Sequence, residues 1–173
     1  MGSNVPDVVF KIRARGESVG GKNPFRWKDV STTDIFPDKN IVIFAMPTLF
    51  PSTNATTHLP DYEAKYDELI SLGVDEVYCL CIKASFPLLQ SAKNLGIINV
   101  KMLPDTHSSF TRSMGMLIEN ESFGSGDMSW RYSAYVVNGE IKKIFSEAGM
   151  MDNCPDDPLE CSDVDTMISY LKS

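Results

Sequence analysis

The sequence predicts an α/β fold in which a mixed β-sheet is flanked by helices. Residues 41–45 form a continuous apolar run rich in β-branched side chains, as in a strand buried on both faces. Residues 57–72 repeat apolar side chains at helical intervals, as in an amphipathic helix. Residues 132–137 and 142–147 flank Asn138-Gly139, a pair that favours a type I′ hairpin between antiparallel strands.

The remaining elements follow from the same patterns and from the turn residues between them. Strands are expected over residues 8–13, 25–30, 76–82 and 100–103, and helices over residues 85–95 and 108–114. Ser31 and its neighbours offer caps for a short helical turn, and the last helix is expected to begin at Ser162-Asp163. Residues 1–173 are expected to form a single domain, because there is no internal repeat, long linker or low-complexity tract.

Composition excludes several classes of partner. The formal net charge of −7 argues against nucleic acid, which needs concentrated Lys and Arg. No apolar run approaches the ~20 residues of a membrane span. The N-terminus lacks the basic and apolar regions of a secretory signal, so a cytoplasmic protein is expected, or an organellar one if a transit peptide was removed.

The cysteines and histidines do not form a metal-ligand pattern. The four cysteines, Cys79, Cys81, Cys154 and Cys161, contain no CxxC pair, and only two histidines are available to complete a set. We therefore expect no metal and no cofactor.

Residues 44–60 have the form of a nucleophile site. An apolar strand runs through a Pro-rich turn into a helix, and a cysteine in the first turn of such a helix is activated by free N–H groups and the helix dipole. No cysteine occurs in this segment, and Asn54 stands where one would be expected. An amide at a helix start can act simply as a cap.

Sequence blocks in a fixed order extend over nearly the whole chain. They are Val5–Phe10, Phe44–Pro47, Thr57–Pro60 with Tyr62-Glu63, Gly73–Leu80, Lys101–Asp105, Phe110–Leu117, Ser129–Ser133, Asp152–Pro158, Ser162-Asp163 and Asp165–Met167. In these blocks the sequence resembles the peroxiredoxins, and within them the mitochondrial and plant-type-II group, which is similar to peroxiredoxin 5. The resemblance implies a thioredoxin-like fold and a tendency to form homodimers.

The resemblance fails at the site of the chemistry. The family signature has a Pro, a Thr or Ser four residues later, and the peroxide-attacking Cys three residues after that. Pro47 matches, but Pro51 stands at the hydroxyl position and Asn54 at the cysteine position, while Arg131 matches the family's catalytic arginine. Neighbouring positions have also changed, which favours natural divergence over an engineered knockout. We therefore expect no catalytic residue, and Pro47, Pro51, Asn54 and Arg131 as a vestigial pocket.

Several alternatives remain open. A displaced nucleophile, for which Cys81 at the end of its strand is the candidate, would keep a thiol peroxidase active in redox homeostasis. A second alternative is a ligand-binding protein in which Arg131 holds a small anion. A third is a subunit that associates with an active peroxiredoxin and modulates it. His58 belongs to a block shared with active relatives, which favours a structural or interface role over that of general base.

Overall fold

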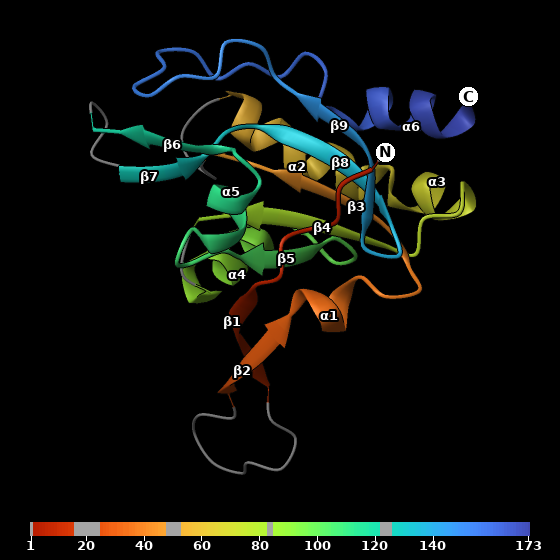
Figure 1. The fold of residues 1–173 in the computed structure, drawn as a ribbon, viewed down its shortest axis with the longest axis horizontal. Helices are drawn as coiled ribbons and strands as arrows, with labels where there is room; N and C mark the ends of the chain where they lie inside the picture. Colours follow the sequence, from red (N-terminus) through yellow and green to blue (C-terminus); the bar gives the residue numbers. More distant parts are fainter. Residues whose placement is uncertain (1, 16–24, 48–52, 83–84, 122–125) are drawn as a thin grey trace.

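The centre of the molecule is a five-stranded sheet in the order β5-β4-β3-β8-β9 (Figure 1). The computed structural model describes residues 2–15, 25–47, 53–82, 85–121 and 126–173. The strands are β3 (Asn40–Ala45), β4 (Glu76–Cys81), β5 (Lys101–Pro104), β8 (Tyr132–Val137) and β9 (Glu140–Ser146). β3, β4 and β5 run parallel, whereas β8 pairs antiparallel with β3 and β9. The expected mixed sheet with a buried central strand is therefore confirmed.

Alternate residues of β3 enter two different cores. Val42 and Phe44 pack with side chains from α2 (Thr53–Ala64), α3 (Tyr66–Ser71), α4 (Ser85–Asn94) and α6 (Val164–Lys172). Ile41, Ile43 and Ala45 pack on the other face with side chains from α1 (Thr32–Ile35), α5 (Ser109–Ser113) and β1 (Val9–Arg15). The two-residue period of the strand thus gives each face its own apolar layer.

Two short antiparallel pairs lie outside the central sheet. β1 pairs with β2 (Phe25–Ser31) and projects from the body of the molecule, as the lower part of Figure 1 shows. β6 (Leu117–Asn120) pairs with β7 (Gly126–Ser129). The sequence predicts both strands of the first pair, though not their pairing, and neither strand of the second, which contains Gly, Asp and Asn, residue types depleted in strands.

The prediction of one helix over residues 57–72 is wrong. Two helices cover this segment, and they are interrupted at Lys65, whose ψ of 14° departs from the helical value. Tyr62 and Leu69, on either side of the break, both enter the same core. Periodicity does not detect the break because both helices keep their apolar faces toward the sheet.

The predicted turns and caps are confirmed at two positions. Asn138 and Gly139 have φ values of 47° and 79°, and a type I′ hairpin requires positive φ at both. Asp163 is the N-cap of α6, where its carboxylate accepts a hydrogen bond from the N–H group of Thr166 at 3.3 Å.

Candidate functional site around Arg131

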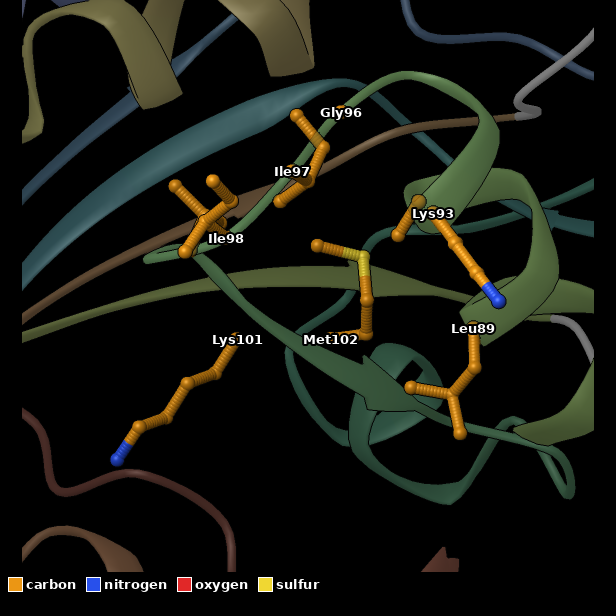
Figure 2. Close-up of a pocket in the computed structure, with 9 residues that line it drawn as sticks. Leu89, Lys93, Gly96, Ile97, Ile98, Lys101 and Met102 are labelled. Atoms are coloured by element: carbon orange, nitrogen blue, oxygen red, sulfur yellow. The ribbon is translucent and has the colours of Figure 1, made fainter.

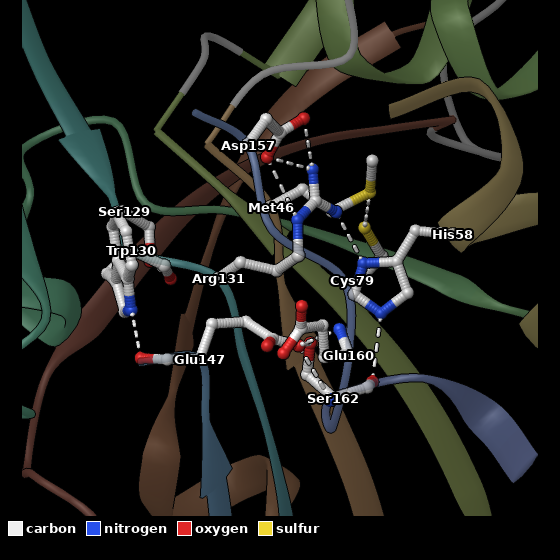
Figure 3. Close-up of polar contacts among 10 residues, drawn as sticks. All are labelled: Met46, His58, Cys79, Ser129, Trp130, Arg131, Glu147, Asp157, Glu160 and Ser162. Atoms are coloured by element: carbon white, nitrogen blue, oxygen red, sulfur yellow. Dashed lines mark hydrogen bonds and ion pairs between the residues drawn. The ribbon is translucent and has the colours of Figure 1, made fainter. Parts of the chain in front are cut away.

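Arg131 lies in the two-residue connection between β7 and β8, and its side chain is completely buried. The backbone around it is fixed by its neighbours. The Trp130 indole N–H donates to the Glu147 carbonyl oxygen at 2.8 Å, and the Glu147 N–H donates to the Arg131 carbonyl oxygen at 3.2 Å. Trp130 and Tyr132, on either side of it in the chain, are buried. The guanidinium is therefore held in a set position (Figure 3).

Asp157 binds one edge of the Arg131 guanidinium. Nη2 of Arg131 lies 2.6 and 2.8 Å from the two carboxylate oxygens, and Nε lies 3.1 Å from Oδ1. Such forked contacts between guanidinium and carboxylate are strong and directional. Since Arg131 is fully buried and the Asp157 side chain is 23% exposed, the carboxylate covers a buried cation from the solvent side.

His58 binds the guanidinium through Nη1. The distance from Nη1 of Arg131 to Nδ1 of His58 is 2.6 Å. A guanidinium only donates hydrogen bonds, so Nδ1 accepts and the ring proton lies on Nε2. Nε2 in turn donates to the carbonyl oxygen of Ser162 at 3.0 Å, an oxygen that also accepts from the Tyr62 hydroxyl at 3.0 Å.

The environment keeps His58 neutral. Burial first, and the nearby Arg131 charge second, lower the pKa of His58 from 6.5 to about 3. The ring also packs against Phe44, which stacks on Tyr62 with ring centroids 4.0 Å apart. With both nitrogens engaged, His58 has a structural role in this arrangement and no lone pair available for general base catalysis.

Residues 148–163, which contain neither helix nor strand, carry Asp157 and are called the C-terminal strap below. One anchor is on β6 and the residue after it, where Asp152 accepts from the N–H group of Glu119 at 2.9 Å and Asn153 from that of Glu121 at 2.8 Å. The second anchor is Glu147, just before the strap. Its Oε1 accepts from the N–H groups of residues 160–162 at 2.9–3.0 Å and from the Ser162 hydroxyl at 2.7 Å.

The charge on Glu147 is stabilised by these donors. Burial alone would raise the pKa of Glu147, but the Ser162 hydroxyl and the backbone N–H groups together hold it below its ordinary value. The strap therefore runs between two hydrogen-bonded anchors, with Asp157 on Arg131 between them.

The structure places the residues predicted for the vestigial pocket as follows. Pro47 is buried just after β3, and Asn54 lies in the first turn of α2, with its side chain outside the described part of the structure. Pro51 lies outside the described residues altogether. Cys81 is the last residue of β4 and is fully buried.

The Arg131 charge reaches Cys79, the other thiol of β4. Burial raises the pKa of Cys79 well above its ordinary value, and Arg131 opposes that rise. The Cys79 thiol lies 3.6 Å from the sulfur of Met46, as Figure 3 shows. A high pKa leaves Cys79 protonated and therefore a poor nucleophile.

All four cysteines lie among the described residues, and all are thiols rather than disulfides. Cys161 donates to the carbonyl oxygen of Ser146 at 3.4 Å, and burial together with Glu147 raises its pKa to about 11. Cys154 packs against Ile118, Met128 and Trp130. These contacts agree with packing roles for both thiols.

The described ranges contain neither a metal-ligating cluster nor a membrane-spanning helix. No three His, Cys, Asp or Glu side chains within those ranges are arranged to hold a metal ion. No helix in that part of the chain is long and apolar enough to cross a bilayer.

Sequence reasoning missed two residues of this network, Asp157 and Glu147. Asp157 lies in the block Asp152–Pro158, so the sequence marks the segment but not its contact with Arg131. Glu147 stands at the end of a predicted strand, where nothing indicates a carboxylate buried beneath a loop. Both contacts join residues distant in the chain, which no local pattern encodes.

Comparison with known proteins gives the family. The redoxin family model matches residues 2–158. A peroxiredoxin of Synechocystis is 50% identical over 168 residues, covering 97% of this chain and 89% of its own. The mitochondrial peroxiredoxin-2F of Arabidopsis thaliana is 28% identical over 152 residues, covering 87% and 74%.

Among solved structures, the Plasmodium falciparum antioxidant protein, a 1-Cys peroxiredoxin, superposes with a TM-score of 0.90 and 29% identity, covering 99% of each chain. The fold is therefore thioredoxin-like, as the sequence predicts. On the family match, the sequence identity and the superposition together, this chain belongs to the peroxiredoxins, in the group that includes the mitochondrial and plant-type-II forms.

Proposed function

We propose that this chain is a peroxiredoxin-family protein that has lost thiol peroxidase chemistry at the family's site and serves as a binding, structural or regulatory subunit. The observation that carries the proposal is Asn54, which stands in the first turn of α2 at the position of the peroxide-attacking cysteine. A carboxamide cannot attack a peroxide oxygen and become a sulfenic acid, whereas a thiolate can.

The contacts of Arg131 support the same proposal. In a peroxidase this side chain has to stabilise a thiolate and a polarised peroxide. Here its donors are directed to His58 and Asp157, and the carboxylate compensates its charge. The guanidinium thus joins α2, β8 and the strap, which is a structural role.

A thiol peroxidase assay tests the proposal directly. We expect the wild-type protein to show no oxidation of dithiothreitol that depends on hydrogen peroxide. A double variant, Asn54→Cys with Pro51→Thr, restores the family signature, and Asn54→Ser with Pro51→Thr is its matched control without a thiol. Activity in the cysteine variant alone would show that the missing thiol is what disables the site. Peroxide-dependent turnover by the wild-type protein would refute the proposal.

The second candidate is a thiol peroxidase with a displaced nucleophile, Cys81. It is supported by relatives named peroxiredoxin and by the position of Cys81 at the carboxyl end of β4. If it is right, Cys81→Ser abolishes turnover and Cys79→Ser, two residues earlier on the same strand, leaves it intact. Equal turnover in the wild-type protein and in Cys81→Ser would eliminate this candidate.

We also propose that the subunit forms a homodimer, with association to an active peroxiredoxin as the alternative, and that it resides in the cytoplasm. Light scattering coupled to gel filtration measures the first, and co-purification with a tagged active relative from the same cells measures the second. Relatives include mitochondrial and chloroplastic forms, so microscopy of the tagged chain should accompany these measurements.

A further inference from the structure

A groove of about 570 Å³ lies between α4 and β5, the edge strand of the central sheet (Figure 2). Its volume is within the range of small-molecule sites. The walls are apolar and come from α4, from the turn after it and from β5: Leu89, Ala92, Ile97, Ile98, Val100 and Met102. The groove is separate from the network around Arg131, and nothing in the proposed function uses it.

The turn that forms one wall is fixed at its helix end. Gly96 has a φ of 73°, its N–H donates to the Lys93 carbonyl oxygen at 3.1 Å, and the N–H of Ile97 donates to that of Ala92 at 3.0 Å. A left-handed residue followed by this six-to-one hydrogen bond is a Schellman-type helix end. Ile97 is thereby directed back toward the last turn of α4.

The other end of the turn is fixed by Glu63 of α2. One carboxylate oxygen accepts from the N–H groups of Ile98 and Asn99 at 2.8 and 2.7 Å, and the other from Val100 at 2.8 Å. Since both ends of residues 96–100 are held, the wall exists before any ligand arrives. A preformed site avoids much of the ordering cost of binding.

The fixed turn keeps apolar surface in contact with water. Ile98 is 86% exposed and Leu89, across the groove, is 39% exposed. Because Glu63 binds the backbone N–H groups of residues 98–100, a change of backbone conformation that buries Ile98 would break these hydrogen bonds. Apolar surface that is held exposed around a concavity is typical of a binding site.

One cation of the groove sets the charge of its ligand. Lys93 extends along the α4 side of the groove, whereas the Lys101 side chain points away from the groove walls in Figure 2. The Lys101 ammonium lies 2.8 Å from Glu76 and over the Tyr78 ring, on the other face of the sheet from Met102. Lys93 has no ion-pair partner among the residues that the structure describes. The positive charge of Lys93 therefore favours an anionic group at this end of an otherwise apolar groove.

We propose that this groove binds a small amphipathic carboxylate, with its aliphatic chain along the apolar walls and its carboxylate at Lys93. The walls supply the affinity through the burial of methylene groups. Lys93 selects the charged headgroup and fixes the direction of the chain.

A chain-length series tests the apolar part. Hexanoate, octanoate and decanoate, titrated below micelle-forming concentrations and followed by amide NMR shifts, should perturb residues 89–102. Affinity should rise about three- to fourfold for each added methylene. Shifts centred on another part of the fold, or affinity independent of chain length, would overturn the proposal.

The headgroup is tested by comparing octanoate with 1-octanol in the wild-type protein and in Lys93→Gln. The variant should weaken octanoate binding about two- to fivefold and leave octanol binding unchanged, as expected for an exposed ion pair. Added salt should weaken octanoate binding only. Lys143→Gln, on the opposite edge strand β9, is the matched control and should bind both ligands as the wild-type protein does.

A third variant tests whether the ligand occupies the groove itself. Ala92→Leu places a larger side chain in the groove and should reduce octanoate affinity at least tenfold, while circular dichroism reports whether the fold is kept. Should Ala92→Leu fail to fold, the exposed Leu89→Gln serves the same purpose. Unchanged octanoate affinity in a folded wall variant would refute the proposal. The proposal would also be refuted if the wild-type protein binds no octanoate and forms a dimer that Ile98→Gln dissociates, because the groove would then be a contact between two copies of the chain.

Discussion

Arg131 donates a hydrogen bond from Nη1 to Nδ1 of His58 across 2.6 Å, which places a permanent cation against a side chain that ordinarily gains a proton near neutral pH. Protonation of the imidazole would remove the acceptor and set two positive charges side by side in the core. The network is therefore stable only while His58 is neutral, and acid should weaken it.

The first prediction is the resulting pH dependence of stability. The pKa of His58 is about 3 in the folded chain and 6.5 as an ordinary value, so between these limits the unfolded state binds the extra proton. The contribution of neutral His58 to the free energy of unfolding is therefore complete above pH 6.5. It falls as the pH decreases toward 3, by at most about 1.4 kcal/mol per pH unit. Urea unfolding between pH 7 and pH 5 measures this slope.

The control for that slope is the second histidine. His58→Phe should be less stable at pH 7 by about 2–4 kcal/mol, because it removes the acceptor of Arg131 Nη1 and one of the two donors to the Ser162 carbonyl oxygen. Its stability should also vary less with pH than that of the wild-type protein. His107 is exposed, so His107→Phe should keep the wild-type slope. An unchanged slope in His58→Phe would mean that the imidazole is not the group responsible.

The second prediction concerns Asp157. Asp157→Ala leaves a buried guanidinium uncompensated and should cost about 2–4 kcal/mol, since breaking a buried ion pair is expensive and this one is partly exposed. Formate, a carboxylate small enough to enter the vacated space, should recover part of the loss in a concentration-dependent way. Thermal unfolding with sodium formate, against sodium chloride at equal ionic strength, provides the measurement.

The neighbouring residue supplies the comparison for Asp157. Asp156 is exposed, and Asp156→Ala should change stability by less than about 0.5 kcal/mol with no specific response to formate. Equal formate effects on both variants would indicate a general salt effect rather than occupation of the site beside Arg131.

The third prediction concerns Glu147. Glu147→Gln removes the charge that accepts three N–H groups and a hydroxyl, and should cost about 1–3 kcal/mol. Amide hydrogen exchange at residues 160–162 should accelerate more than exchange in β3. Glu160→Gln, an exposed side chain within the strap, should leave both quantities near the wild-type values. Slow exchange at residues 160–162 in Glu147→Gln would show that the strap has other supports.

How far the sequence predicts the fold depends on the range of the interaction. The hairpin at Asn138-Gly139 and the cap at Asp163 were predictable, because each is fixed by residues a few positions apart. The buried run 41–45 was predictable because its composition alone suits a central strand. The break at Lys65 was not, because the same core accepts the side chains before and after it.

The site shows the same division. The resemblance identified Arg131 and the unusual Asn54, since both are compared position by position with relatives. It could not show that Arg131 contacts Asp157 and His58, which are 26 and 73 positions away. The contact with Asp157 depends on the path of the strap, which Glu147 and β6 anchor, whereas the contact with His58 depends on how α2 packs on the sheet.

The strap also imposes an order on assembly. A ribosome releases Arg131 before Asp157 and Ser162, so a nascent chain can contain every strand of the central sheet while the buried cation at the start of β8 still lacks its counterion. The network around Arg131 therefore cannot form until the C-terminal segment is present. A chain that stops before Asp157 would retain all the strands of the sheet. It would also contain a buried Arg131 without its counterion, which should make it less stable and more readily degraded.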